Sequence, residues 1–571
     1  MNYIKIIISF IGLSLTFNAC QEDYLERYPL DEISAADFFK TPNDLKIYMN
    51  QYYHKSNFPL PAFDALSDLR QDTYIGETGI DTRLQGTRTV ASGSAIGYTS
   101  IRSVNYFIAN YKKCEGDFKD YKQYVGEAHF FRAKFYFDLL KGFGDVPWVT
   151  KVLGTDSPEL YEARTPRNIV ADNIIADLDT AAMYLTEDKT NGCSRINKWM
   201  ALLLQSRIAL YEGTWEKYHN GTPFGVSNAQ PAKYLNKAVE AATAIMNSAK
   251  YDIYSTGKPT SDYVDLFGLR DYSTNKEVMF WSKMSETLGV YSNGKLYRLE
   301  APSGYGITKS MADSYLCTDG QPITTSPLYK GNNTILDEMK DRDPRFYQTI
   351  FTPDAPWLID ANGVTKTWNE VFVKLFSNST YACPTGYARR KDYNPIASYH
   401  SQNYEVAPSI QYRYAEVLLN FAEAKAELGT ITQADIDISI KKLRSRVGMP
   451  NLTLSNIPND PDWKFPTLSP TINEIRRERK VELVLENLRW NDIARWAAAD
   501  ELIVGTRPKG GKVSQYIKKP AYTVDSEGFL DPFQKAMPNG YGFVLDRDYL
   551  NPISETQLLL NPNMVQNPGW Q

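Results

Sequence analysis

The chain has 571 residues, which is long enough for several domains or for one large helical-repeat fold. Its 63 basic and 67 acidic side chains give a net charge of −4, so there is no electrostatic reason to expect a nucleic-acid partner. Tyrosine, with 39 copies, outnumbers glycine, with 34. Its ring is apolar on both faces and polar at one end, so it suits cores and ligand-contacting surfaces alike.

The N-terminus is typical of a processing signal. Lys5 precedes the apolar run 6–17, which is too short to span a bilayer comfortably, and Cys20 follows shortly after it. This pattern resembles a bacterial lipoprotein signal peptide over residues 1–19, with Cys20 as the lipidated first residue of the mature chain. Phe17 stands where such signals usually carry Leu, and an ordinary secretory signal followed by a chance cysteine is the alternative. Several acyl chains would anchor the protein stably, because each buried CH₂ contributes roughly 0.8 kcal/mol.

The first half of the mature chain is predicted to be mainly helical. Thr41 and Pro42 are a cap and first turn for a helix within 31–53, whereas the Gly-, Thr- and Arg-rich segment 64–100 predicts long loops, which are usually functional. Apolar residues three and four apart predict amphipathic helices at 98–112, 121–141, 168–185, 194–211 and 232–249. Alanines at their crossing points favour stacking of helix pairs in the manner of tetratricopeptide repeats.

The pattern changes from 251 to 409, where Pro, Gly, Asn and aromatic residues predict a loop-rich insertion with a few short strands or helices. Helices are predicted again at 412–428, 433–447 and 471–496, before an irregular tail. We therefore expect a mainly α protein with one domain over 20–571. Its tetratricopeptide-like scaffold covers about 31–250 and 410–500, its insertion about 251–409, and its tail about 501–571.

The search for catalytic or metal-binding patterns finds little. The four histidines are far apart and form no metal-spaced cluster, and neither a GxSxG turn nor a phosphate-binding loop is present, so no metal or cofactor is predicted. The remaining cysteines, Cys114, Cys193, Cys317 and Cys383, could pair in any of three ways, and we expect them to stay unpaired.

A group of charged residues at 478–489 allows two interpretations. Glu478, Arg479, Glu482 and Arg489 lie at helical spacings that allow ion pairs between helices. A catalytic carboxylate pair is the functional alternative, and a glycoside hydrolase leaves no local signature that would exclude it. The structural interpretation is favoured, because apolar core residues flank the helix.

Several segments resemble signatures of the SusD/RagB family, and they occur in order over nearly the whole mature length. They are residues 98–110, 126–147, 164–181, 192–201, 413–424, 475–496, 551–553 and 567–570. The acidic residues after Cys20 are also similar to the signal that directs Bacteroidetes lipoproteins to the cell surface. The resemblance implies a non-enzymatic lipoprotein of the outer membrane that faces the cell exterior. It would capture a nutrient, an oligosaccharide or alternatively a peptide as in RagB-type proteins, and deliver it to a SusC-like TonB-dependent transporter.

The resemblance further implies a binding site built from loops, in which aromatic rings stack on sugar faces and planar polar groups contact hydroxyls. For any single aromatic residue, burial in the core is the commoner role. Trp357 and Trp368 are favoured because each lies in a polar, turn-rich setting. The candidate ligand residues are Asp68, Arg70, Asp72, Tyr74, Arg83, Trp281, Tyr291, Tyr297, Trp357, Trp368 and Tyr393.

Replacing Cys20 tests the predicted anchor. Cys20→Ala removes the thiol that would carry the lipid, so the protein should move from the membrane fraction to the soluble fraction on cell fractionation. Cys317→Ala, in the predicted insertion, is the control and should leave the distribution unchanged. Retention of the Cys20→Ala protein in the membrane fraction would contradict the assignment.

Overall fold

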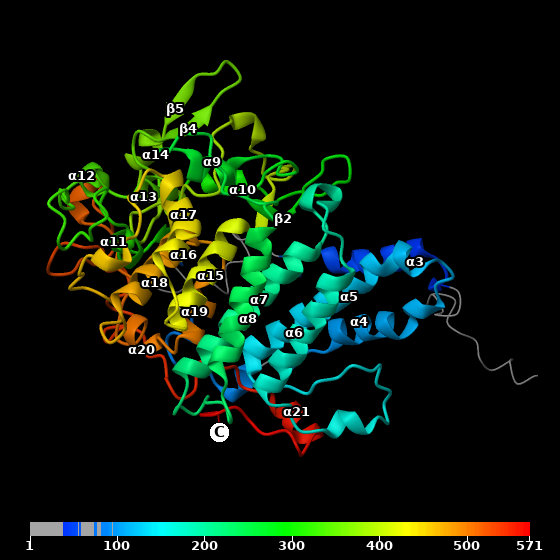
Figure 1. The fold of residues 1–571 in the computed structure, drawn as a ribbon. Helices are drawn as coiled ribbons and strands as arrows, with labels where there is room; N and C mark the ends of the chain where they lie inside the picture. The colour runs from blue at the N-terminus through cyan, green and yellow to red at the C-terminus, as the bar shows by residue number, and fades with distance from the viewer. Residues whose placement is uncertain (1–37, 55, 59–73, 77–80, 94, 571) are drawn as a thin grey trace, which may run out of the picture.

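The computed structural model describes residues 38–54, 56–58, 74–76, 81–93 and 95–570 (Figure 1). Within these ranges the protein is mainly helical with a few short strands, as predicted. In this part of the chain no helix has the length and apolar character needed to cross a bilayer. The helices of the first half are α3 (Pro42–Asn50), α4 (Thr99–Asn110), α5 (Phe118–Phe143), α6 (Arg167–Tyr184), α7 (Lys198–Tyr218) and α8 (Pro231–Asn247).

Helix α3 begins where the sequence places its cap. Thr41 Oγ1 accepts a hydrogen bond from the Asp44 backbone N–H at 3.2 Å, and the Asp44 carboxylate accepts one from the Thr41 N–H at 2.8 Å. This reciprocal pair satisfies two donors that the first turn leaves without a helical partner, and Pro42 fits the first turn because it has no N–H to satisfy.

The scaffold helices pack in sequence order, α5 on α6, α6 on α7 and α7 on α8 (Figure 1). Two of these pairs meet at a glycine. A Cβ added at Gly126 of α5 would lie 2.9 Å from Leu185 Cγ, and one added at Gly213 of α7 would lie 2.9 Å from Leu235 Cγ. Both contacts are too close for a real Cβ, so these glycines permit the near approach of neighbouring helices that stacked helix pairs require.

The insertion combines short helices with short strands. Its helices are α9 (Asp262–Gly268), α10 (Lys295–Leu299), α11 (Lys309–Ser314), α12 (Ile335–Met339), α13 (Arg345–Thr349) and α14 (Asn369–Phe372). The described strands form three two-stranded antiparallel sheets. Strand β1 (Tyr74–Gly76), from the N-terminal loops, pairs with β3 (Tyr305–Ile307) of the insertion, β2 (Val278–Ser282) pairs with β6 (Ser409–Arg413) at the end of the insertion, and β4 (Pro356–Ile359) pairs with β5 (Thr365–Thr367). A separate apolar core, which includes Phe346 and Trp368, holds the insertion together.

The last helices are α15 (Tyr414–Glu427), α16 (Gln433–Ile438), α17 (Ile440–Arg446), α18 (Pro470–Glu482), α19 (Arg489–Arg495), α20 (Ala499–Leu502) and α21 (Glu555–Leu560). Two helices were wrongly predicted to be continuous, because each is divided in the structure. The segment 433–447 breaks at Ser439, and 471–496 breaks between 482 and 489. Leu485 and Asn487 have φ of +66° and +61°, a left-handed conformation that an α-helix cannot continue through.

Side chains from outside α18 stabilise this break. The Glu482 carbonyl accepts hydrogen bonds from Arg413 Nη2 at 2.8 Å and from the Tyr263 hydroxyl at 2.7 Å. The Val484 carbonyl accepts one from Lys391 Nζ at 2.7 Å. Cations at a helix C-terminus satisfy its free carbonyls and complement its dipole. Because these partners are distant in sequence, the periodicity of 471–496 could not reveal the break.

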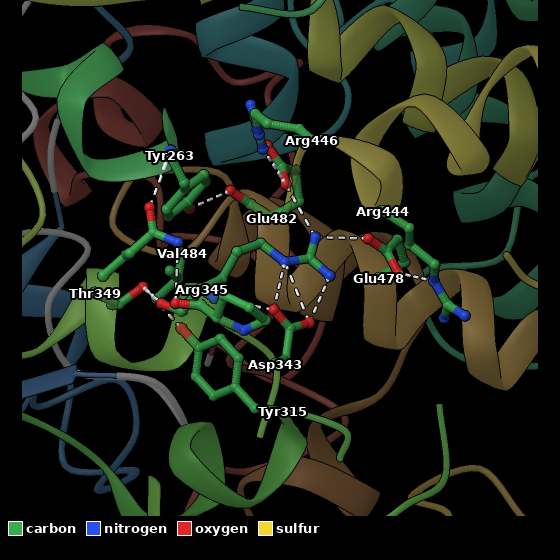
Figure 2. Close-up of polar contacts among 12 residues, drawn as sticks. Tyr263, Tyr315, Asp343, Arg345, Thr349, Arg444, Arg446, Glu478, Glu482 and Val484 are labelled. Atoms are coloured by element: carbon green, nitrogen blue, oxygen red, sulfur yellow. Dashed lines mark hydrogen bonds and ion pairs between the residues drawn. The ribbon is translucent and has the colours of Figure 1, made fainter. Parts of the chain in front are cut away.

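Glu482 is the centre of a buried ion-pair network (Figure 2). Its carboxylate accepts hydrogen bonds from Arg446 at 2.6 Å, from Arg413 at 2.7 Å and from Arg345 at 3.0 Å. Burial raises the pKa of Glu482, but the charges of the three arginines outweigh this effect and hold the pKa below its ordinary value. Helix α13 of the insertion, strand β6 and helix α17 are thereby tied to α18.

The other charged residues of this segment also serve the fold. Glu478 accepts hydrogen bonds from Arg345 at 2.6 Å and from Arg444 at 2.8 Å (Figure 2), and Arg479 donates to Asp492 at 2.9 Å. The Arg489 guanidinium lies over the Trp496 ring, 5.7 Å from its centroid. The two glutamates are engaged by arginines inside the protein, which confirms the structural interpretation of this group.

The four cysteines outside the signal region are confirmed as unpaired, and all four are buried. Burial raises the pKa of Cys383 to about 12, so this residue is a thiol at neutral pH.

Neutralising Glu482 should be strongly destabilising. Glu482→Gln leaves three buried guanidinium groups without their shared countercharge, and breaking a buried ion pair in this way costs about 3–5 kcal/mol. Urea denaturation followed by circular dichroism measures the change. The matched control is Glu240→Gln, because Glu240 pairs with Lys237 on the surface at 3.2 Å and such a pair contributes about 0–1 kcal/mol. Equal stability of the two variants would contradict a central role for Glu482.

Candidate functional site

The N-terminal loops and the insertion meet at one small sheet. Strand β1 pairs with β3, so that Tyr74 lies opposite Ile307 and Gly76 lies opposite Tyr305. Backbone pairing therefore joins the two regions from which the site was predicted to be built. Tyr74 belongs to this sheet. The other predicted contacts in the same loop, Asp68, Arg70 and Asp72, lie outside the described residues.

Helix α10, shortly before β3 in the chain, begins at a buried carboxylate. Glu405 accepts hydrogen bonds from the N–H groups of Leu296, at 2.9 and 3.0 Å, and of Tyr297, at 3.2 Å, and its carboxylate also binds the Ser292 hydroxyl at 2.8 Å. Gly294 precedes the helix with φ of +69°, and a Cβ there would lie 2.8 Å from the Gln402 carbonyl. A negative charge at the N-terminus stabilises this short helix and holds the backbone at Tyr297.

Four aromatic residues lie on α10, β4 and the loops connected to them, and we call Tyr291, Tyr297, Trp357 and Tyr404 the aromatic face. Tyr297 is 46% exposed and Tyr404 is 69% exposed, whereas Tyr291 and Trp357 are partly buried. The rings of Tyr291 and Tyr404 pack edge to face, with centroids 5.5 Å apart. Tyr404 was not predicted, although its position directly after the polar residues 401–403 is of the same kind that favoured Trp357.

Hydrogen bonds hold Trp357 against the end of α10. Its indole N–H donates to the Glu300 carbonyl at 3.0 Å, and its own carbonyl accepts from the Tyr393 hydroxyl at 2.7 Å. The Glu300 carboxylate contacts His400 Nδ1 at 2.7 Å, and His400 Nε2 contacts the Asn394 carbonyl at 2.6 Å. Helix α10, strand β4 and the 393–405 segment therefore form one connected support for the aromatic face (Figure 1).

Three predicted aromatic contacts lie in cores, and this is a correction to the sequence analysis. Trp281 is 2% exposed and donates to the Gly192 carbonyl, Trp368 is 1% exposed and stacks on Phe351, and Tyr393 is 3% exposed. A ring covered on both faces has no surface on which a sugar can stack. The turn-rich sequence around Trp368 was misleading, because that turn folds inward over the core of the insertion.

Arg83 supports the C-terminal tail. Its guanidinium donates to the Asn551 side chain and lies over the Trp490 ring, 4.8 Å from the centroid. Burial lowers the pKa of Arg83 to about 10. Arg83 therefore lies with residues of the tail and not with the aromatic face, a placement that its loop sequence did not indicate.

The aromatic face is suited to binding without chemistry. Exposed tyrosine and tryptophan rings offer apolar faces to stack on, and their polar atoms fix orientation. The histidines occupy separate environments. His219, for example, is buried, and burial lowers its pKa to about 3. Within the described ranges no group of three or more His, Cys, Asp or Glu residues is placed to hold a metal ion.

A family model described as "SusD family" matches residues 270–570, which is more than half of the chain. The chain belongs to the SusD family. Proteins of this family bind their ligands without catalysing a reaction. A second model, described as "Starch-binding associating with outer membrane", matches residues 90–210. The two matches lie on either side of the junction between the scaffold and the insertion.

Individual relatives agree with this assignment. Two SusD-like proteins of Formosa agariphila are 26% and 24% identical to the chain, and the matches cover 99% and 86% of the chain and 100% and 93% of the relatives. The solved structure of a SusD-like protein from Bacteroides fragilis superimposes with a TM-score of 0.72 at 22% identity, covering 95% of this chain and all of that one. These likenesses confirm the SusD-like fold.

Truncating a buried ring should reduce the stability of the protein far more than truncating an exposed one. Trp368→Ala removes a packed side chain and should lower the free energy of unfolding by about 3–5 kcal/mol. Tyr297→Ala should change it by less than about 0.5 kcal/mol, because a half-exposed surface ring contributes little to stability. Thermal denaturation of both variants measures the difference, and a large loss in Tyr297→Ala would mean that this residue serves the fold.

Proposed function

We propose that this SusD-family protein is a surface lipoprotein that captures an oligosaccharide on the aromatic face and delivers it to a SusC-like TonB-dependent transporter of the outer membrane. The observation that carries the proposal is Tyr297. A buried glutamate caps its helix, yet its ring is left 46% exposed beside the end of α10 that holds Trp357. Because the backbone that carries the exposed ring is already held in place, little further ordering of that backbone is needed when a ligand binds.

The comparisons support a carbohydrate ligand and an outer-membrane location. One matching family model is described as starch-binding and associated with the outer membrane. A solved structure from Bacteroides fragilis with a TM-score of 0.69 and 20% identity is described as a SusD-like carbohydrate-binding protein, and it covers 92% of this chain. The lipid anchor on Cys20 and the transporter partner come from the sequence analysis and remain proposals.

Calorimetric titration with a panel of purified ligands tests the proposal. The panel contains neutral oligosaccharides of the starch type, β-linked glucans, mannans and peptides of similar size. We expect at least one neutral oligosaccharide to bind and the peptides to show no heat of binding. Binding of peptides alone would overturn the oligosaccharide proposal in favour of RagB-type peptide capture.

Single variants then place the ligand. Tyr297→Ala and Trp357→Ala should each weaken the bound oligosaccharide about tenfold, which corresponds to roughly 1.4 kcal/mol for one lost stacking surface. Tyr161→Ala is the matched control, because Tyr161 is also about half exposed but lies after α5, outside the insertion. Unchanged affinity in both aromatic-face variants would show that the ligand binds elsewhere.

A further inference from the structure

A second feature of the molecule points to a ligand of different chemistry. A cleft of about 350 Å³ opens between α11, α18, the loop 460–465 and the segment 501–509. Helices α11, α18 and α20 lie at the lower left of Figure 1, whereas α10 and β4 lie at the top. None of the four residues of the aromatic face lines the cleft. Its volume is at the small end of the range of about 300–1,000 Å³ that is usual for small-molecule sites.

The surface of the cleft is predominantly basic. Eight lysines and arginines line it, against four acidic residues. Several of the basic groups form ion pairs with carboxylates that do not line the cleft. Lys509 pairs with Asp525 at 2.7 Å, and Arg507 pairs with Asp531 at 2.9 Å. These pairs fix the positions of the Lys509 and Arg507 side chains, both of which line the cleft.

The acidic residues of the lining contribute less negative charge than their number suggests. Asp313 and Asp460 each form an ion pair with a basic residue of the same lining. Burial and the neighbouring carboxylate of Asp500 raise the pKa of Glu501 above its ordinary value. The fourth, Asp462, is exposed. Among the side chains that line the cleft, basic groups therefore outnumber acidic ones, and this composition favours a negatively charged ligand.

Two buried nitrogen donors at the cleft have no hydrogen-bond partner in the described part of the chain. They are the indole N–H of Trp463 and the Nε–H of Arg476. The Arg476 side chain is 2% exposed, and its guanidinium is held over the Trp496 ring at 4.2 Å. A buried donor without a partner is energetically unfavourable, and a ligand that supplies acceptor oxygens would satisfy it.

We propose that the cleft binds a saccharide that carries a negatively charged group, a carboxylate or a sulfate ester, against its lysines and arginines. The hydroxyl groups of Thr308, Ser310, Ser314, Thr324 and Thr506 also line the cleft and match the hydroxyls of a sugar. The Trp463 ring adds an aromatic surface of the kind on which sugars stack. This inference rests on the proposed function only in taking the ligand to be a glycan, since it concerns another part of the molecule.

Calorimetry on the full-length protein tests the inference with four probes, which are trigalacturonate, a sulfated trisaccharide, maltotriose and a hexaglutamate peptide. We expect one or both of the charged sugars to bind, with an affinity that falls as the ionic strength rises. In the double variant Trp463→Ala/Lys509→Gln the dissociation constant for that sugar should rise at least tenfold. The two charged sugars distinguish a carboxylate ligand from a sulfate ester.

The chain offers a closely matched charge control. Lys442 pairs with Asp252 at 2.9 Å and its side chain is 40% exposed, as is that of Lys509, but it lies outside the cleft. Lys442→Gln should leave the binding of the charged sugar unchanged, whereas Lys509→Gln alone should weaken it. Circular dichroism of each variant establishes that the fold is retained.

Three results would overturn the inference. They are no binding of either charged sugar, equal effects of Lys509→Gln and Lys442→Gln, and hexaglutamate binding as tight as that of the charged sugars. The proposed function is tested separately, by the binding of neutral oligosaccharides to the unmodified protein and to Tyr297→Ala. If no neutral oligosaccharide binds, or if Tyr297→Ala leaves its affinity unchanged, the proposed function is contradicted. If the charged sugar is still sensitive to Lys509→Gln in that case, the cleft remains a glycan site.

Discussion

One buried negative charge organises the contact between the scaffold and the insertion. Three arginines from α13, β6 and α17 converge on the Glu482 carboxylate of α18, and each is itself removed from water. Burying any one of these charges alone would be prohibitively unfavourable, so the elements that carry them must be assembled together. The arrangement gives the loop-rich insertion a fixed position on the helical scaffold.

The aromatic face follows a similar principle on a smaller scale. Helix α10 is too short to be stable alone, and hydrogen bonds from its first N–H groups to the Glu405 carboxylate stabilise it. The result is an exposed Tyr297 on a rigid support. In the basic cleft, the largely buried carboxylates of Asp525 and Asp531 likewise hold Lys509 and Arg507. Both surfaces thus separate the residues that meet solvent from the carboxylates that position them.

Much of the fold could be predicted from the sequence, because it is written in local patterns. The cap at Thr41, the apolar periodicity of α5 to α8 and the change of pattern at 251 all have counterparts in the structure. The residues of the candidate site were harder to predict. Trp357 and Trp368 occupy similar local sequences, yet the Trp368 ring is stacked on Phe351 in a core whereas Trp357 remains partly exposed. Contacts between residues that are distant in sequence decide that difference, and such contacts cannot be predicted from the local pattern of a single sequence.

The division between α18 and α19 has a consequence for how the chain folds. The carbonyls that this break releases are satisfied by Lys391 from the insertion and by Arg413 and Tyr263 from still other segments. Before these groups arrive, nothing favours the left-handed turn at Leu485 over continuation of the helix. The path of the chain just after 482 therefore depends on side chains that are distant in sequence, and it is stabilised only when Tyr263, Lys391 and Arg413 are in place.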